Sequence, residues 1–115
     1  MSIKALVVGV SDYSTIKQSN LPFCANDIVA VYKALVNGLA VKKENIISLG
    51  DTEVVTTSDF IEALRFMIDN IKDDDTFILY FSGHGGNLSG EHHLIFSDSG
   101  ITVSYTHLRA HETAA

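Results

Sequence analysis

Short apolar runs alternate along this chain with longer stretches in which apolar residues recur every three or four positions. The runs cover 3–10, 45–50 and 75–83, are rich in branched or aromatic side chains, and are bounded by glycine or serine. Continuous apolar runs of this length are typical of strands buried on both faces of a parallel sheet. The pattern therefore predicts three buried strands.

The stretch between the first two runs has the spacing of an amphipathic helix. Within 26–38, apolar residues return at helical intervals along one face: Ile28, Val31, Tyr32, Leu35 and Val36. Asn26 or Asp27 can cap the first turn, because their side chains accept hydrogen bonds from free backbone N–H groups. Gly38 can end the helix.

A second helix is predicted over 56–72, with Ser58 as its N-cap, and a fourth strand over 92–98. The order is thus β-α-β-α-β-β, with a glycine-rich loop before the last strand. Such alternation builds an α/β fold, in which a parallel sheet is flanked by helices on right-handed crossovers. A length of 115 residues corresponds to at most one domain.

The charge balance bears on partners and location. The chain carries 14 acidic against 8 basic residues, a formal net charge of −6, and its Lys and Arg are not clustered. We therefore expect neither nucleic acid nor an anionic membrane as a partner. The N-terminal apolar run is too short to span a bilayer and lacks a signal-peptide cleavage site. Cys24 is the only cysteine, which excludes an intramolecular disulfide and favours a reducing, cytoplasmic setting.

The segment 103–115 has no clear helix or strand period. Its letters "VSYTH" are the translation of part of a common transposase sequencing adapter, and "LRAHET" resembles the rest of that adapter in a shifted frame. We therefore interpret 103–115 as a sequencing artefact, which removes His107 and His111 from the candidate site residues. The alternative is a polar C-terminal tail.

His84 is the candidate for acid–base chemistry. It follows the third apolar run in "YFSGHGG", and ligands of open α/β sheets bind at the carboxyl ends of the strands. The flanking Gly83, Gly85 and Gly86 can adopt positive φ, and backbone N–H groups of such a loop can face a developing oxyanion. An imidazole can accept a proton at neutral pH. The alternative is a loop histidine that titrates in solvent without a role.

Four strings carry a resemblance to a known family: "IKALVVGVSDY", "LPFCANDIVAVYKAL", "FILYFSGHGG" and "HHLIFSDSG". Together they resemble the large-subunit region of caspase-like cysteine peptidases, above all the metacaspase and bacterial caspase-like branch. The resemblance implies a caspase-like parallel sheet and a protein or peptide substrate. It also implies that His84 is the general base and that the backbone N–H of Gly85 belongs to the oxyanion hole.

The family's nucleophilic cysteine lies at the end of the next core strand, in an Asp-x-Cys string that this sequence lacks. Cys24 lies in "LPFCANDI", which resembles the metacaspase pattern Leu-x-Gly-Cys-x-Asn-Asp with Phe23 in place of glycine; that cysteine is not the family's nucleophile. A helix N-terminus favours thiolate, which keeps Cys24 as the alternative. We expect 1–102 to be a partial caspase-like catalytic domain, truncated before the cysteine strand and inactive as written.

The resemblance gives Asp27 a second role. In metacaspases the aspartate of this Asn-Asp pair lines the pocket for a basic P1 side chain, so the parent protein is expected to cleave after Arg or Lys. A carboxylate can bind Arg through two parallel hydrogen bonds. The alternative is that Asp27 only caps its helix. Asp98 matches an aspartate often found in the family, and we assign it no role.

No cofactor or metal site is predicted. His92 and His93 are adjacent on a predicted strand and point to opposite faces, so they cannot both join His84 on one metal. The acidic run 73–75 is interpreted as a solvated turn. Calcium activates some metacaspases, but no EF-hand spacing is present, so calcium activation stays open.

Two other function classes, a scaffold and an α/β-hydrolase, compete with an endopeptidase fragment. A non-catalytic caspase-like scaffold or signalling module would keep the sheet without the full catalytic pair. An α/β-hydrolase needs a G-x-S-x-G elbow, which does not occur here. Neither a dinucleotide-binding nor a P-loop glycine motif is present. The oligomeric state is not predicted by the sequence.

Overall fold

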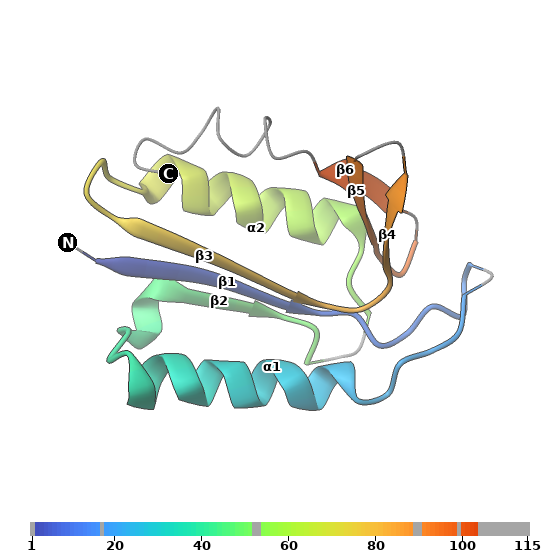
Figure 1. Cartoon of the computed structure of the whole chain (residues 1–115), viewed down its shortest axis with the longest axis horizontal. Coiled ribbons are helices and arrows are strands. Elements are labelled where there is room, and N and C mark those ends of the chain that lie inside the picture. The colour runs from blue at the N-terminus through green and yellow to red at the C-terminus, as the bar shows by residue number, and fades with distance from the viewer. Residues whose placement is uncertain (1, 17, 52–53, 89–90, 99, 104–115) are drawn as a thin grey trace.

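The computed structural model describes residues 2–16, 18–51, 54–88, 91–98 and 100–103. The order of elements in Figure 1 is β1 (Ile3–Gly9), α1 (Cys24–Lys33), a π-helical turn η1 (Ala34–Gly38), a 3₁₀ turn η2 (Lys43–Asn45), β2 (Ile46–Leu49), α2 (Thr57–Asn70), β3 (Thr76–Ser82), β4 (Gly85–Leu88), β5 (Glu91–Ile95) and β6 (Gly100–Val103).

The first three strands form one parallel sheet in the order β2-β1-β3. Helix α1 covers one face of this sheet and α2 covers the other (Figure 1). The predicted α/β class, with a parallel sheet between helices, is therefore confirmed. Within the described part of the chain β3 pairs only with β1, so β3 is an edge strand. The loops that follow β1, β2 and β3 emerge at the carboxyl edge of this sheet.

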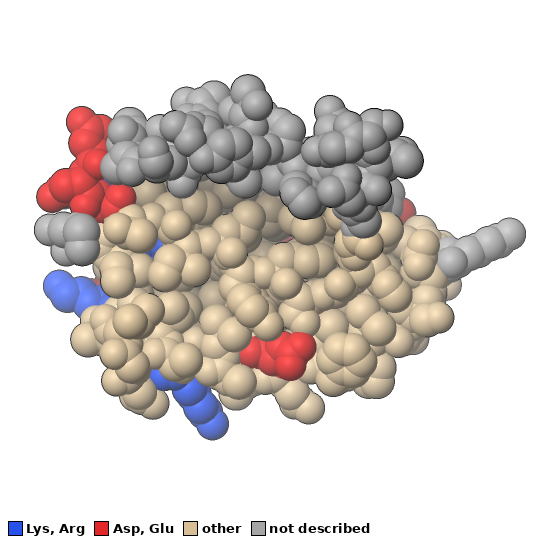
Figure 2. All heavy atoms as spheres, in the orientation of Figure 1, with Lys and Arg blue, Asp and Glu red and all other residues tan. Residues whose placement is uncertain are grey.

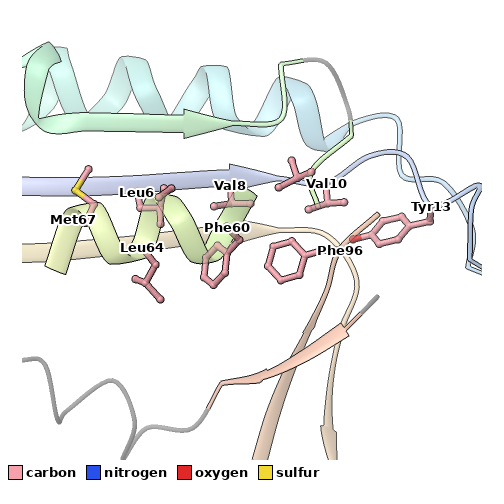
Figure 3. Packing of buried hydrophobic residues seen from close by; sticks show 10 residues of the cluster. Leu6, Val8, Val10, Tyr13, Phe60, Leu64, Met67 and Phe96 are labelled. Carbon is pink, nitrogen blue, oxygen red and sulfur yellow. The ribbon is translucent and has the colours of Figure 1, made fainter. Parts of the chain in front are cut away.

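Alternate side chains of β1 enter two separate cores, as a strand buried on both faces requires. Leu6 and Val8 pack with Phe60 of α2, in a cluster that also includes Phe96, whereas Ala5 and Val7 pack against α1. Figure 3 shows the α2-side cluster extending along β1 from Met67 to Phe96, with Tyr13 at its far end. The hydroxyl of Tyr13 therefore lies near the chain that follows β3.

The predicted caps are wrong for α1. Phe23 is the N-cap, no side chain caps it, and Asn26 and Asp27 lie inside the first turn. The hydroxyl of Ser11 instead accepts a hydrogen bond from the backbone N–H of Ala25 at 3.2 Å. A residue distant in the sequence thus replaces the local cap, and the Asp27 side chain is left for another contact.

The predicted N-cap of α2 is also wrong by two positions. Thr56, not Ser58, caps this helix, in a reciprocal capping box with Asp59. The carboxylate of Asp98 accepts a further hydrogen bond from the backbone N–H of Thr57 at 2.9 Å. Asp98, which the sequence left without a role, therefore satisfies a free donor at the start of α2.

The segment after β3 differs most from the prediction. The expected glycine loop contains strand β4, and β4, β5 and β6 form a separate antiparallel sheet. Strand β5 ends at Ile95, before the predicted end at 98, because Phe96 and Ser97 turn into the protein and are buried. Strand β6 (Gly100–Val103) was not predicted, and it includes Val103, the first residue of the segment interpreted as an artefact. Most of the predicted artefact, 104–115, lies outside the described residues.

No helix in the described ranges is long and apolar enough to cross a membrane. On the face shown in Figure 2, the Lys and Arg side chains of the described residues are separated from one another and form no basic patch.

Candidate active site

His84 lies at the carboxyl end of edge strand β3, where it is half-buried. Its Nε2 lies 2.6 Å from the backbone carbonyl oxygen of Ser19, in the loop between β1 and α1. The ring is therefore directed neither into the core nor freely into solvent. The loop after β1 holds it at the edge of the sheet where ligands of α/β folds bind.

The contact with Ser19 determines which ring nitrogen can act as a base. A carbonyl oxygen only accepts hydrogen bonds, so Nε2 of His84 must carry the proton and donate it. In the neutral imidazole the lone pair then lies on Nδ1. The geometry thus leaves Nδ1 as the proton acceptor.

Tyr13 is a site residue that the sequence did not indicate. Its side chain is fully buried, and its ring meets the His84 ring edge-on, with centroids 4.6 Å apart. The hydroxyl accepts a hydrogen bond from the backbone N–H of His84 at 2.8 Å and donates one to the carbonyl of Ile95 at 2.8 Å. Burial raises the pKa of the Tyr13 phenol, and the hydrogen bond from His84 opposes that rise. The phenol is therefore protonated and able to donate at neutral pH.

Gly83 and Gly85 are needed because other atoms of the protein lie close to their Cα atoms, and not because their backbone has positive φ. Neither Gly83 nor Gly85 has positive φ, so that prediction is wrong for both. A Cβ on Gly83 would lie 2.6 Å from the hydroxyl oxygen of Tyr13, and one on Gly85 would lie 3.1 Å from the carbonyl oxygen of His93. Glycine at 83 therefore makes room for the phenol.

Asp27 is joined to the same edge of the sheet. Its carboxylate accepts a hydrogen bond of 2.7 Å from the hydroxyl of Ser82, the last residue of β3. Asp27 is half-buried, and no Lys or Arg within the described part of the chain forms an ion pair with it. The Asp27 carboxylate is thus bonded to a residue that lies two positions before His84 in the chain.

Cys24 lies at the start of α1 with no exposed surface. A nucleophile must reach a substrate carbonyl carbon, and a fully buried sulfur cannot do so in this conformation. Burial favours the structural interpretation of Cys24 over the catalytic one.

The acidic run 73–75 is not uniformly solvated, which corrects the sequence interpretation. Asp75 is buried and accepts hydrogen bonds from the backbone N–H groups of Ser2 and Lys72, and it lies 3.5 Å from Nζ of Lys4. These contacts lower the pKa of Asp75, the bond from Lys72 contributing most. Asp75 ties the start of β1 to the turn before β3.

The described residues contain no group of three or more His, Cys, Asp or Glu side chains placed to hold a metal ion. His92 and His93 are consecutive on β5, opposite Asn87 and Gly86 of β4.

Comparison with known proteins identifies the family. A family model described as "Metacaspase, peptidase C14 domain" matches residues 3–105. The chain is similar to Metacaspase-1 of Schizosaccharomyces pombe, at 27% identity over 88 residues, covering 72% of this chain and 20% of that protein. It is similar to Metacaspase-4 of Arabidopsis thaliana, at 30% identity over 95 residues, covering 79% and 22% respectively. The chain thus spans about a fifth of the length of these curated relatives. With the family model covering nearly the whole chain, the resemblance inferred from the sequence is confirmed, and the chain belongs to the metacaspase peptidase family.

Proposed function

We propose that this chain carries the histidine half of the active site of a cysteine endopeptidase, within a partial catalytic domain at 1–102. His84 is the general base, and the nucleophilic thiol belongs to a segment of the parent protein that is not among these residues. The observation that carries the proposal is the contact between Nε2 of His84 and the Ser19 carbonyl, which leaves Nδ1 available. The substrates are proteins or peptides, as membership of a peptidase family implies.

In the proposed reaction, Nδ1 of His84 accepts the thiol proton and the thiolate attacks the scissile carbonyl carbon. The imidazolium then gives that proton to the leaving amine, and water hydrolyses the thioester with His84 again acting as base. The Ser19 carbonyl stabilises the imidazolium through the Nε2–H bond and fixes the direction of Nδ1. Since the chemistry requires a reduced thiol, we assign the parent protein to a reducing compartment such as the cytoplasm.

Gly85 suits the role of oxyanion donor because of its place in the β4–β5 ladder. The N–H of Ile95 donates to the carbonyl of His84 at 3.0 Å, so His84 and Ile95 form a hydrogen-bonded pair. Such pairs alternate along an antiparallel ladder, so Gly85, opposite Leu94, directs its N–H away from β5. Gly85 is exposed, and within the described ranges this N–H is therefore open to meet a developing negative charge.

Asp27 is proposed to bind a basic P1 side chain. Its carboxylate is held by Ser82 through one oxygen, which leaves acceptor positions for a guanidinium or ammonium group. A half-buried carboxylate without a cationic partner in the described residues would gain most from such a ligand. The proposal is therefore cleavage after Arg or Lys.

A non-catalytic scaffold is the second candidate, and the burial of the only cysteine favours it for the chain by itself. Determining the uninterrupted coding sequence beyond residue 102 would distinguish the endopeptidase from the scaffold. If it encodes a strand ending in Asp-x-Cys, the longer protein should cleave peptides with Arg or Lys at P1 and not those with Asp. If that strand lacks a cysteine and no peptide is cleaved, the scaffold function holds instead.

Variants of the longer protein test each role. His84→Ala should lower kcat by about 10²- to 10⁴-fold, the usual contribution of a general base. Asp27→Asn should reduce kcat/KM for Arg and Lys substrates. Cys24→Ala is the control and should retain cleavage. Full activity of His84→Ala would overturn the proposed base.

A further inference from the structure

The hydroxyl of Tyr13 takes the place of one backbone hydrogen bond next to the antiparallel pair of β4 and β5. A hydrogen-bonded pair in such a ladder normally exchanges two N–H···O bonds. Between His84 and Ile95 only one is direct, from the Ile95 N–H to the His84 carbonyl at 3.0 Å. In place of the other, the His84 N–H donates to the Tyr13 hydroxyl and that hydroxyl donates to the Ile95 carbonyl, each at 2.8 Å. The Tyr13 hydroxyl is thus inserted between the backbones of His84 and Ile95.

This insertion keeps the ladder from closing at His84. With two direct bonds, the His84 backbone would be drawn against β5 as one more residue of β4. The inserted hydroxyl holds His84 away from Ile95 on one side, and β4 begins only at Gly85. Gly83 permits this, since a Cβ there would lie 2.6 Å from the hydroxyl oxygen and 3.0 Å from Cζ of Phe81.

Tyr13 also contacts the ring of His84 directly, and it contacts the loop whose Ser19 carbonyl bonds to that ring. Its own ring packs edge-on against the imidazole at a centroid distance of 4.6 Å. Its backbone N–H donates to Oδ1 of Asn20 at 2.7 Å, which closes the loop that carries Ser19. Ser19 in turn accepts from Nε2 of His84 at 2.6 Å. One buried residue therefore contacts the backbone of His84, its ring, and the loop that orients its ring.

We propose that Tyr13 is the positioning residue of His84, acting as a spacer in the β4–β5 ladder that sets both the backbone and the ring of the histidine. The role rests on the proposed function of His84 as the base, whereas the spacer itself is a property of this chain alone. Loss of the hydroxyl leaves the Ile95 carbonyl and the His84 N–H either unpaired or directly bonded to each other. In either case His84 moves relative to Ser19.

The test is NMR on the ¹⁵N,¹³C-labelled 115-residue chain, comparing Tyr13→Phe with Tyr80→Phe. The control removes the same hydroxyl from a side chain packed against the opposite core. In Tyr13→Phe the His84 amide should change its hydrogen-exchange rate by about threefold to tenfold relative to the amides of β3, and the His84 ring ¹⁵N shifts should move. Tyr80→Phe should change neither. If His84 amide exchange and ring shifts are the same in both variants, the proposal is overturned.

A measurement on the unsubstituted chain covers the case in which Tyr13→Phe does not fold. The inserted hydroxyl predicts nuclear Overhauser effects from the Tyr13 ring Hε protons to the His84 amide proton, and their absence overturns the spacer. In the longer protein, Tyr13→Phe should lower kcat while leaving KM nearly unchanged. An unchanged kcat, in a protein that loses activity with His84→Ala, would refute the positioning role. If His84→Ala remains active while the NMR effects are present, the proposed base fails and the spacer stands.

Discussion

The hydroxyl of Ser82 donates a 2.7 Å hydrogen bond to the carboxylate of Asp27 and so ties the end of β3 to the first turn of α1. The two residues are 55 positions apart in the sequence. The bond joins the strand that carries His84 to the helix that carries the candidate P1 carboxylate. Both parts of the proposed site are thereby held at the same edge of the sheet.

Ser82→Ala should lower the free energy of unfolding by about 1–3 kcal/mol, because a half-buried carboxylate loses a donor. Urea unfolding followed by circular dichroism measures the change. Ser48→Ala, at an exposed position of β2, is the matched control and should have a much smaller effect. Equal stability of the two variants would mean that the bond does not join β3 to α1 in solution.

Gly50→Ala should be among the most destabilising glycine substitutions. Gly50 has φ of +120°, and a Cβ there would lie 1.9 Å from the carbonyl oxygen of Gly9. Strain and clash together should cost more than about 2 kcal/mol. Gly38→Ala, where no atom lies within 4 Å of the added Cβ, should be neutral or stabilising. Thermal unfolding of the two variants tests the contrast, and similar melting temperatures would contradict it.

Asp98→Ala should destabilise α2, although Asp98 lies 41 positions after Thr57 in the sequence. The Asp98 carboxylate accepts from both the backbone N–H and the hydroxyl of Thr57, the first residue of that helix. Loss of an N-terminal acceptor typically costs about 1 kcal/mol. Asp51→Ala, at an exposed turn, is the control. Hydrogen exchange in the first turn of α2 should increase in Asp98→Ala and not in the control; unchanged exchange would show that Thr56 alone is sufficient.

Much of this fold was predictable because its information is local. Three apolar runs and two amphipathic stretches gave the α/β order correctly, and the glycine-flanked His84 is at the end of a strand as expected. The errors lie where distant residues take over local roles. Ser11 serves the first turn of α1, Asp98 assists Thr56 at α2, and neither pairing is visible in a single sequence.

Tyr13 was missed for the same reason. It lies outside the apolar runs and amphipathic stretches of the sequence, yet its hydroxyl bonds to Ile95, 82 positions later in the chain. Strand β4 was missed because glycine is a poor strand former, and only the pairing with β5 makes a strand of Gly85 and Gly86.

Asp75 should make stability depend on pH in the acid range. Its pKa is lowered in the folded chain by the N–H of Lys72, with smaller contributions from Ser2 and Lys4, so the folded state binds the proton less tightly than the unfolded state. The resulting stability is present above the ordinary carboxyl pKa and is lost as pH falls through the folded value, below about pH 4. Asp75→Asn should be less stable at pH 7 and lose less stability between pH 5 and about pH 2.5, whereas the exposed Asp69→Asn should follow the unsubstituted chain. Parallel pH curves for all three proteins would contradict the assignment.

The proposed role of His84 depends on the loop after β1, which fixes the ring so that Nδ1 is the proton acceptor. A long-range ¹H–¹⁵N correlation spectrum of the labelled chain, recorded above the ordinary histidine pKa of about 6.5, reports the tautomer directly. We predict that His84 is protonated on Nε2 and bears its lone pair on Nδ1, because the Ser19 carbonyl accepts from Nε2. A His84 protonated on Nδ1 would contradict both the Ser19 contact and the proposed role of Nδ1.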